Sequence, residues 1–272
     1  MASETLFQCP NCAAALKQGD KQYFCANGHS FDLAKQGYVN LLLPRDTGSA
    51  APGDNREMLR SRREFLDGGY YAKFSAAVCQ EIAPSKSSRV DILDAGCGEG
   101  YYLRAAAETL QDMGRQAALY GIDVSKSAIR YAAGRYKQIR FAVASNYHLP
   151  IRTRSVDCLL CIFAPRCEAE FSRVLKPEGN LIVAAPGPRH LVQLRELLYE
   201  CPPPIGERGT MGDGFRLARQ SNVRYEIFLT SHDLLNLFLM TPFSRHADKQ
   251  LLEGIDSLAC EVDFRIFVYQ KR

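Results

Sequence analysis

The sequence predicts an α/β protein that builds a doubly wound sheet and carries a small N-terminal metal-binding module. Four residues with the spacing of metal ligands lie within the first 29 positions. An apolar segment at 90–95 runs into a glycine-rich turn and then into a helix-like pattern. Strand-like and helix-like segments alternate after that turn, and such βα units build a sheet that is covered by helices.

Length and composition narrow the class further. The 272 residues fit a catalytic domain of roughly 200 residues with a small appended module. Charged residues at 24% and hydrophobic residues at 46% exclude a disordered chain. The longest apolar run, Cys158–Pro165, is far shorter than the roughly 18 residues that cross a bilayer. The N-terminal residues show no secretory signal, and we expect a cytoplasmic protein.

The first element is the predicted metal module. Its four ligands form two pairs, Cys9-x2-Cys12 and Cys25-x3-His29, each enclosing turn-forming residues. Two such turns complete a tetrahedron suited to zinc. A disulfide and a chance spacing are the alternatives, and a reducing cytoplasm disfavours the disulfide. Because four protein ligands leave no open position for water, we expect structural zinc.

The remaining cysteines have ordinary explanations. Cys79 and Cys260 lie in apolar patterns and are expected in the core. Cys158 and Cys161 share one predicted strand, and their spacing directs them to opposite faces, which argues against a shared metal. Cys167 follows just beyond that strand, where a nucleophile is conceivable.

The glycine-rich turn contains Asp94, Gly96, Gly98 and Gly100. Its Gly-x-Gly-x-Gly spacing, opened by an acidic residue, differs from the Gly-x-Gly-x-x-Gly of dinucleotide-binding folds. A phosphate needs no carboxylate there, whereas a ligand with an ammonium group favours one. A second predicted strand ends at Asp123, where a carboxylate typically accepts both ribose hydroxyls of a nucleoside cofactor. An NAD or nucleotide-sugar enzyme on the same scaffold is the alternative.

These residues resemble the S-adenosylmethionine site of class I methyltransferases. The resemblance implies that the glycines admit the methionine moiety and that Asp123 binds ribose. It also implies that three residues of the segment 141–150 flank adenine: Ser145, Asn146 and His148. Many relatives carry Asp at the position of Asn146, and an amide serves adenine as both donor and acceptor. The expected cofactor site includes two further loop residues, Glu99 and Tyr101.

The later elements complete the sheet in order. We expect strand four within 155–165, then a helix, a Lys-Pro-Glu-Gly turn and strand five within 170–188. A strand at 225–229, a helix capped from Thr230 and an alternating strand at 260–270 then form an antiparallel addition. The Pro- and Gly-rich stretch 202–214 is expected to be a loop that covers the substrate.

One stretch of the sequence carries basic residues without any acidic residue. The net charge is only +4, but the 33 residues 124–156 contain seven basic residues and no acid. These residues are Lys126, Arg130, Arg135, Lys137, Arg140, Arg152 and Arg154. Such a stretch suits phosphate contacts, and a solvated helix face is the alternative.

The whole chain, from about Phe7 to Gln270, resembles the RlmA-type 23S rRNA guanine-N1 methyltransferases. The matching segments are GHSFDLAKQGYVNLL, the connector that begins PGD, DAGCGEGYY, IFAP, LKPEG, PGPRHL and MTPF. The resemblance implies methylation of guanine N1 in hairpin 35 of 23S rRNA, S-adenosylmethionine as donor, a zinc module and a homodimer. It further implies that Tyr71 and His190 contact the cofactor, although a core role for Tyr71 and a helix start at His190 stay open.

Three segments follow from this assignment. We expect a zinc-binding RNA-recognition module at 1–45, connector helices at 46–88 and the methyltransferase domain at 89–272. A splayed-out base would stack on an aromatic side chain, and the candidates are Phe31, Tyr38, Phe163 and Phe215. No carboxylate is singled out as a general base.

Three competing functions stay open. The first is a small-molecule methyltransferase whose zinc module is purely structural. The second is an RNA-binding protein with a vestigial cofactor fold, and the third is transfer to a pyrimidine carbon through a covalent bond to Cys167.

Overall fold

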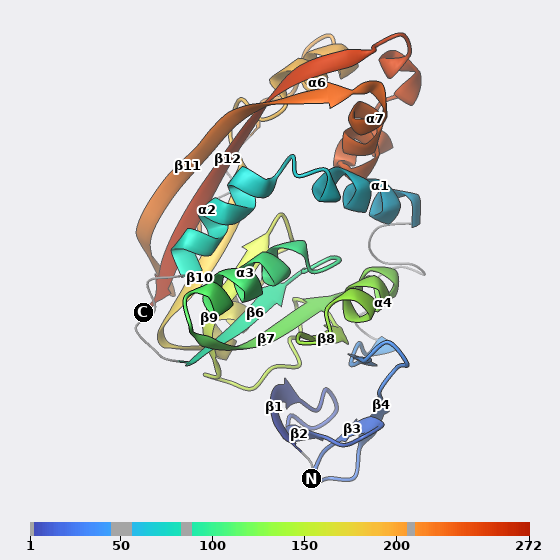
Figure 1. Ribbon diagram of the computed structural model, residues 1–272. Helices are drawn as coiled ribbons and strands as arrows, with labels where there is room; N and C mark the ends of the chain where they lie inside the picture. Colours follow the sequence, from blue (N-terminus) through green and yellow to red (C-terminus); the bar gives the residue numbers. More distant parts are fainter. Residues whose placement is uncertain (1–2, 45–55, 83–88, 206–209) are drawn as a thin grey trace.

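The computed structural model describes residues 3–44, 56–82, 89–205 and 210–272. Parts of the expected connector and of the expected loop at 202–214 therefore lie outside the described residues. Figure 1 shows a small sheet at the N-terminal end, a central sheet flanked by helices, and a long hairpin that reaches the opposite end.

The N-terminal module is a small antiparallel sheet. Its strands β1 (Ser3–Gln8), β2 (Ala15–Gln18), β3 (Gln22–Phe24) and β4 (Ser30–Asp32) are ordered β1-β2-β3-β4. The turn after β1 places Ala13 at φ 59°, and the turn after β3 places Gly28 at φ 81°. Both are left-handed conformations that occur in tight turns. Ala13 directly follows the ligand pair Cys9 and Cys12, and Gly28 lies between Cys25 and His29.

The large sheet has eight strands in the order β11-β12-β10-β9-β6-β7-β8-β5. The strands are β5 (Tyr38–Asn40), β6 (Arg89–Ala95), β7 (Gln116–Asp123), β8 (Arg140–Val143), β9 (Val156–Ile162), β10 (Leu175–Pro186), β11 (Phe215–Thr230) and β12 (Ser257–Lys271). β12 is antiparallel to β10 and to β11, whereas the pairs from β10 to β5 are parallel. The strand order reverses between β6 and β9, which makes their carboxyl ends the switch point where ligands bind in such sheets.

Helices lie on both faces of this sheet. They are α1 (Arg56–Asp67), α2 (Ala72–Ile82), α3 (Tyr101–Asp112), α4 (Lys126–Arg135), α5 (Glu168–Val174), α6 (Val192–Leu198) and α7 (Ser231–Met240). Two 3-10 turns, η2 (Pro242–Arg245) and η3 (Lys249–Leu252), follow α7. The expected cap at Thr230 is confirmed, because its hydroxyl accepts a hydrogen bond from the Asp233 amide. The predicted doubly wound sheet with a small N-terminal module is therefore confirmed.

The two faces of the large sheet have separate cores. On one face, side chains from α2, α3 and α4 pack on the sheet around Phe74, Leu103 and Ile129. On the other face, α5 and the N-terminal module pack together on the strands. Cys158 belongs to the first core and Cys161 to the second, so the expected opposite directions of these two thiols are confirmed.

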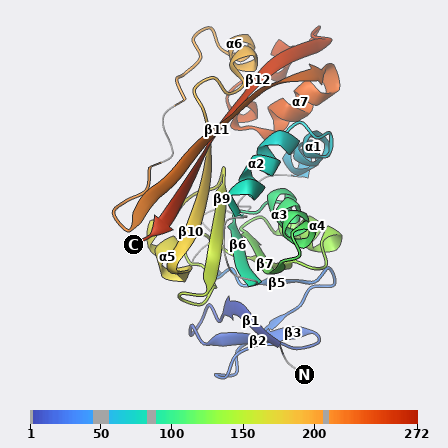
Figure 2. The same cartoon turned by 60° about the vertical axis from the view of Figure 1, so that its left-hand side comes forward.

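The N-terminal module takes the place of a covering helix. The segment 144–155 between β8 and β9 is described throughout and forms no helix. Instead Phe7 packs edge-on against Tyr120 with ring centroids 5.2 Å apart, and the Gln8 amide donates to the Pro150 carbonyl. β5 also joins the large sheet beside β8, and Figure 2 shows the module lying directly beneath that edge. The module and the large sheet therefore share one hydrophobic core.

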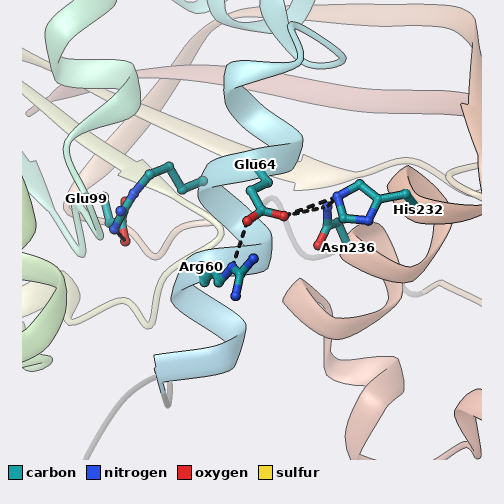
Figure 3. A network of polar contacts seen from close by, with 6 residues as sticks. Arg60, Glu64, Glu99, His232 and Asn236 are labelled. Carbon is teal, nitrogen blue, oxygen red and sulfur yellow. Dashed lines mark hydrogen bonds and ion pairs between the residues drawn. The ribbon is translucent and has the colours of Figure 1, made fainter.

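Helix α1 is fixed by polar contacts to α7. Figure 3 shows Glu64 between three partners: Arg60, Asn236 and His232. The Glu64 carboxylate lies 2.7 Å from Arg60 Nε and 3.2 Å from His232 Nε2. The contacts of Glu64 with Asn236 and His232 join the connector to the C-terminal part of the chain, whereas the contact with Arg60 lies within α1. Among the described residues, no helix combines the length and apolarity that a bilayer crossing requires.

Candidate functional site

The four predicted metal ligands meet at one point of the module. Cys9, Cys12, Cys25 and His29 each offer a ligand atom, and these atoms lie within 4.8 Å of one another. Cys9 and Cys25 Sγ lie 3.6 and 3.5 Å from His29 Nδ1, and the Cys12 and Cys25 sulfurs are 3.8 Å apart. A tetrahedron with Zn–S near 2.3 Å and Zn–N near 2.0 Å has edges of about 3.8 Å between sulfurs and about 3.5 Å from sulfur to nitrogen. The three distances match these edges, so the cluster fits a zinc ion.

A second cluster of predicted residues lies at the switch point of the large sheet. Gly96, Gly98 and Gly100 all have positive φ, at 87°, 53° and 79°. A Cβ on Gly96 would lie 2.3 Å from the Ala164 Cβ, so only glycine lets the two loops touch. This contact presses the loop after β6 against the loop after β9.

Asp123 stands at the end of β7, beside the glycine loop. Its carboxylate accepts hydrogen bonds from the Gly98 amide at 3.0 Å and from the Ser125 amide at 2.8 Å. Ser125 in turn caps α4, because its hydroxyl accepts from the Ala128 amide. The side chain thus connects the glycine loop to the start of the next helix.

Asp94 lies beneath the glycine loop. It is 1% exposed, and neither carboxylate oxygen has a hydrogen-bond partner among the described residues. Burial, with a smaller effect of the nearby Asp123, raises the pKa of Asp94 to about 8. A buried carboxyl without a donor is costly, and a cation above it would lower that cost. This environment fits a cofactor that carries an ammonium group.

One cavity of roughly 1170 Å³ connects these features. Eight of the ten predicted cofactor residues line it: Tyr71, Gly96, Gly98, Glu99, Tyr101, Asp123, Asn146 and His190. Asp94 and Gly100 are not among its lining residues. The volume exceeds the usual range of about 300–1000 Å³ for one ligand, which leaves room for two reactants.

The Glu99 side chain is held by the connector. Arg63 of α1 donates to both Glu99 oxygens at 2.8 Å, and its guanidinium lies 4.2 Å from the centre of the Tyr131 ring. Figure 3 shows Glu99 on one side of α1 and the Glu64 contacts to His232 and Asn236 on the other side. The ion pair anchors α1 to the wall of the cavity.

Tyr71 and His190 lie close together although 119 positions separate them in the sequence. Their ring centroids are 6.4 Å apart, and Phe264 contacts both rings. Burial, and to a smaller extent Arg195, lowers the pKa of His190 to about 3. The Asp263 amide donates to Nδ1 of this neutral ring, so its proton resides on Nε2.

The adenine-flanking residues are only partly brought to the cavity. Asn146 donates to the Pro165 carbonyl at 2.9 Å and lines the cavity together with Ser145. His148 is exposed and pairs with Ser145 in an isolated bridge, outside the lining residues.

The candidate nucleophile and the four aromatic candidates also differ in whether they line the cavity. Cys167 lies at the N-cap of α5 and does not line the cavity, which removes the geometric support for a covalent mechanism. Tyr38 and Phe215 are buried in the two cores, and Phe31 is packed at the edge of one of them. Phe163 lines the cavity and is 46% exposed.

Three arginines of the cavity were not foreseen. Arg62, Arg166 and Arg195 line it from three separate segments. Arg195 is 5% exposed and donates to the carbonyls of Pro188 and Pro203. No short motif unites these residues, because only the folded chain brings α1, the end of β9 and α6 to one place.

The fold and this site define the class of the protein. The strand order, the glycine loop after β6 and the carboxylate at the end of the neighbouring β7 are those of the class I methyltransferase fold. Residues 86–227 match the model of a methyltransferase domain, and residues 7–46 match the model described as the N-terminal region of RlmA, a zinc ribbon.

Relatives identify the family. A Micromonospora griseorubida protein, provisionally named a 23S rRNA (guanine-N(1)-)-methyltransferase, is 36% identical over 89% of this chain and 87% of its own length. The 23S rRNA (guanine(748)-N(1))-methyltransferase of Streptomyces fradiae is 32% identical over 95% of both chains. The YcgJ protein of Bacillus subtilis, a solved structure, matches 75% of this chain and 99% of its own with a TM-score of 0.48 and 15% identity. The chain belongs to the RlmA-type 23S rRNA (guanine-N1)-methyltransferases and is a methyltransferase.

Proposed function

We propose that this enzyme transfers a methyl group from S-adenosylmethionine to N1 of one guanine in hairpin 35 of 23S rRNA. The observation that carries the proposal is one cavity whose lining includes the glycine loop and Asp123 together with Phe163 and three arginines. The glycine loop and Asp123 suit a nucleoside with an ammonium group, and Phe163 and the arginines suit a base with its phosphates.

In the proposed donor site, the predicted residues contact different parts of the cofactor. S-adenosylmethionine supplies an electrophilic methyl group on its sulfonium. Gly96 and Gly98 admit its methionine part, Asp123 accepts from the ribose hydroxyls, and Asn146 faces the adenine. Tyr71 and His190 also line the cavity, and Nε2–H is the one N–H donor of the neutral His190 ring. Glu99 and Tyr101 complete the wall.

Positioning dominates the proposed mechanism. Guanine N1 attacks the methyl group in line with the departing sulfur, so holding both reactants in one cavity supplies much of the rate. The carboxylates at the cavity are engaged elsewhere: Glu99 pairs with Arg63, Asp67 with Arg135, and Asp123 with two amides. His190, with a pKa of about 3, is a weak base. In this proposal the N1 proton therefore passes to solvent water and not to a dedicated side-chain base.

We also propose a structural zinc ion on Cys9, Cys12, Cys25 and His29, an RNA-recognition role for residues 1–45, and connector helices in 46–88. Residues 89–272 would form the catalytic domain. A homodimer acting in the cytoplasm would place two cavities around one folded RNA.

The decisive experiment is methylation of undermethylated 23S rRNA with labelled donor, followed by mapping of the label. We expect label at N1 of one guanine of hairpin 35 with the wild-type protein and none with Asp123→Ala. Label on a pyrimidine, or none on RNA, would refute the proposal. Activity on a small molecule without RNA would favour the alternative of a small-molecule methyltransferase with a purely structural module.

A further inference from the structure

Phe163 has an unusual backbone and an unusual exposure. It directly follows β9, has φ 56°, and is 46% exposed although it lines the cavity. A bulky residue in the left-handed region costs on the order of 1–2 kcal/mol, and such strain persists where the surrounding structure enforces it. The surrounding structure therefore holds Phe163 in a disfavoured backbone conformation at the wall of the cavity.

One side of the Phe163 ring rests on other aromatic rings. Phe74 stacks on it with centroids 5.5 Å apart and planes at 30°, and Phe264 lies 4.9 Å away. Tyr102 approaches edge-on at 6.5 Å. Because this support lies on the core side, the exposed part of the ring faces the open cavity.

The loop that carries Phe163 is joined to the proposed donor site. Ala164 contacts Gly96 so closely that no side chain fits between them, and the Pro165 carbonyl accepts from Asn146 at 2.9 Å. The Cys161 thiol lies 3.5 Å from the Ala164 carbonyl. The aromatic ring and the glycine loop therefore keep a fixed separation.

The charges of the cavity lining favour an anionic nucleotide. Arg62, Arg166 and Arg195 line the same cavity as Phe163. Among its carboxylates, Glu99 and Asp67 are paired with arginines and Asp123 accepts from two backbone amides. A nucleotide extruded from an RNA hairpin brings a flat base and flanking phosphates, and an aromatic ring and guanidinium groups that line one cavity match these two parts.

We propose that Phe163 is the stacking residue for the acceptor guanine. This inference rests on the proposed function. The guanine ring lies on the exposed part of the Phe163 ring, with its N1 edge directed to the methyl group at the glycine loop. Of the four aromatic candidates, Phe163 alone lines the cavity. Stacking of a base on an aromatic ring is worth about 1–3 kcal/mol, so its loss should reduce RNA methylation by roughly 5- to 150-fold.

The test compares Phe163→Leu, which keeps apolar bulk, with Phe163→Tyr, which keeps the aromatic face. Phe228→Ala is the control, because Phe228 is 74% exposed on β11 and outside the cavity. The measurements are kcat/KM for undermethylated 23S rRNA, donor affinity by calorimetry, and thermal stability. We expect the Leu variant to lose methylation in the range given above with unchanged donor affinity, the Tyr variant to retain it, and the control to match the wild type.

The outcomes separate the two proposals. If the wild type methylates RNA and the Phe163→Leu variant is equally active, the stacking role is overturned and the proposed function is not. A Leu variant that loses donor affinity in parallel with activity also overturns it, because Phe163 then serves the donor. A wild type that methylates no guanine in RNA overturns the proposed function and this inference together.

Discussion

Two carboxylates of the site, Asp94 and Asp123, occupy opposite environments. Asp123 accepts two backbone hydrogen bonds at the cavity wall, whereas Asp94 lies behind the glycine loop without a partner among the described residues. Two amide donors favour the charged form of a carboxylate, and burial favours the neutral form. We therefore propose different tasks for them: Asp123 would contact the cofactor directly, and the buried Asp94 would favour its ammonium group.

Replacement of Asp123 by alanine is expected to weaken donor binding without unfolding the protein. Hydrogen bonds to a charged group are worth about 1.5–3 kcal/mol each, so loss of two ribose contacts should reduce affinity at least a hundredfold. Calorimetry with S-adenosylmethionine measures the effect. Asp123→Asn is the matched control, since its amide oxygen still accepts from the Gly98 or Ser125 amide. Unchanged affinity in the alanine variant would disprove the ribose assignment.

Asp94 predicts a specific pH dependence of stability. Its pKa is about 8 in the folded protein and near 3.9 in an unfolded chain. The folded state thus holds a proton that the unfolded state releases, so its free energy of unfolding falls as the pH rises from about 4 to about 8. The slope is at most about 1.4 kcal/mol per pH unit.

Asp94→Asn is expected to remove this dependence. Without bound S-adenosylmethionine, the free energy of unfolding of this variant should rise relative to that of the wild type as the pH is raised from 5 to 8. Denaturant unfolding measures the difference. The same variant should bind S-adenosylmethionine more weakly. A difference in stability that is constant with pH would show that Asp94 does not titrate in this range.

Among the elements, the glycine loop and the loop after β9 act as a pair. Gly96→Ala is expected to combine backbone strain at φ 87° with a 2.3 Å clash against Ala164, a loss of about 2–5 kcal/mol in unfolding free energy. Gly114→Ala is the matched control, because Gly114 has φ 68° but open space around its Cβ position. Thermal unfolding of both variants separates the effect of the clash from that of backbone strain. Equal losses of stability in the two variants would show that the clash contributes nothing.

The strands and helices around the site could be predicted because their local signals are strong. The apolar run before Asp94, the glycine turn and the cap at Thr230 each follow from a few adjacent residues, and the structure confirms these elements. Tyr38–Asn40 was expected within the zinc module, but it forms the edge strand of the large sheet. Three residues beside one parallel neighbour carry no pattern of their own, so only tertiary packing reveals this strand.

The site itself was only partly predictable. Gly96, Gly98 and Asp123 were foreseen from local spacing, and Tyr71 and His190 from the resemblance to a family. Arg195 was not foreseen, because its role depends on carbonyl groups of Pro188 and Pro203 and on the fold of α6. Phe163 could be distinguished from the other aromatics only through its exposure and its backbone conformation.

At the scale of the whole molecule, the zinc module and the methyltransferase sheet share one hydrophobic core, and we expect them to unfold as one unit. Leu6, Phe7 and Cys9 belong to the same core as Leu93, Tyr120 and Ile122. Zinc binding supplies roughly 10 kcal/mol or more to the folding of small zinc modules. Loss of the metal should therefore destabilise the catalytic sheet as well as the module.

Cys25→Ala, or treatment with a strong chelator, is expected to lower the temperature of a single unfolding transition by many degrees. Differential scanning calorimetry and a metal assay test this together. Cys201→Ala is the control, since Cys201 is exposed and far from the four ligands in sequence. Two separate transitions, or a protein purified without zinc, would contradict a shared core.

The docking of the module has a practical consequence for dissecting the enzyme. A fragment that starts after residue 45 would leave Tyr120 and its neighbours without the cover of Leu6 and Phe7, and it would lack β5. Inactivity of such a truncation would reflect a bare apolar sheet rather than lost RNA recognition. Chimaeras between relatives would likewise need to transfer residues 1–45 together with the sheet surface beneath them. The smallest exchangeable piece of this enzyme is therefore larger than its sequence motifs imply.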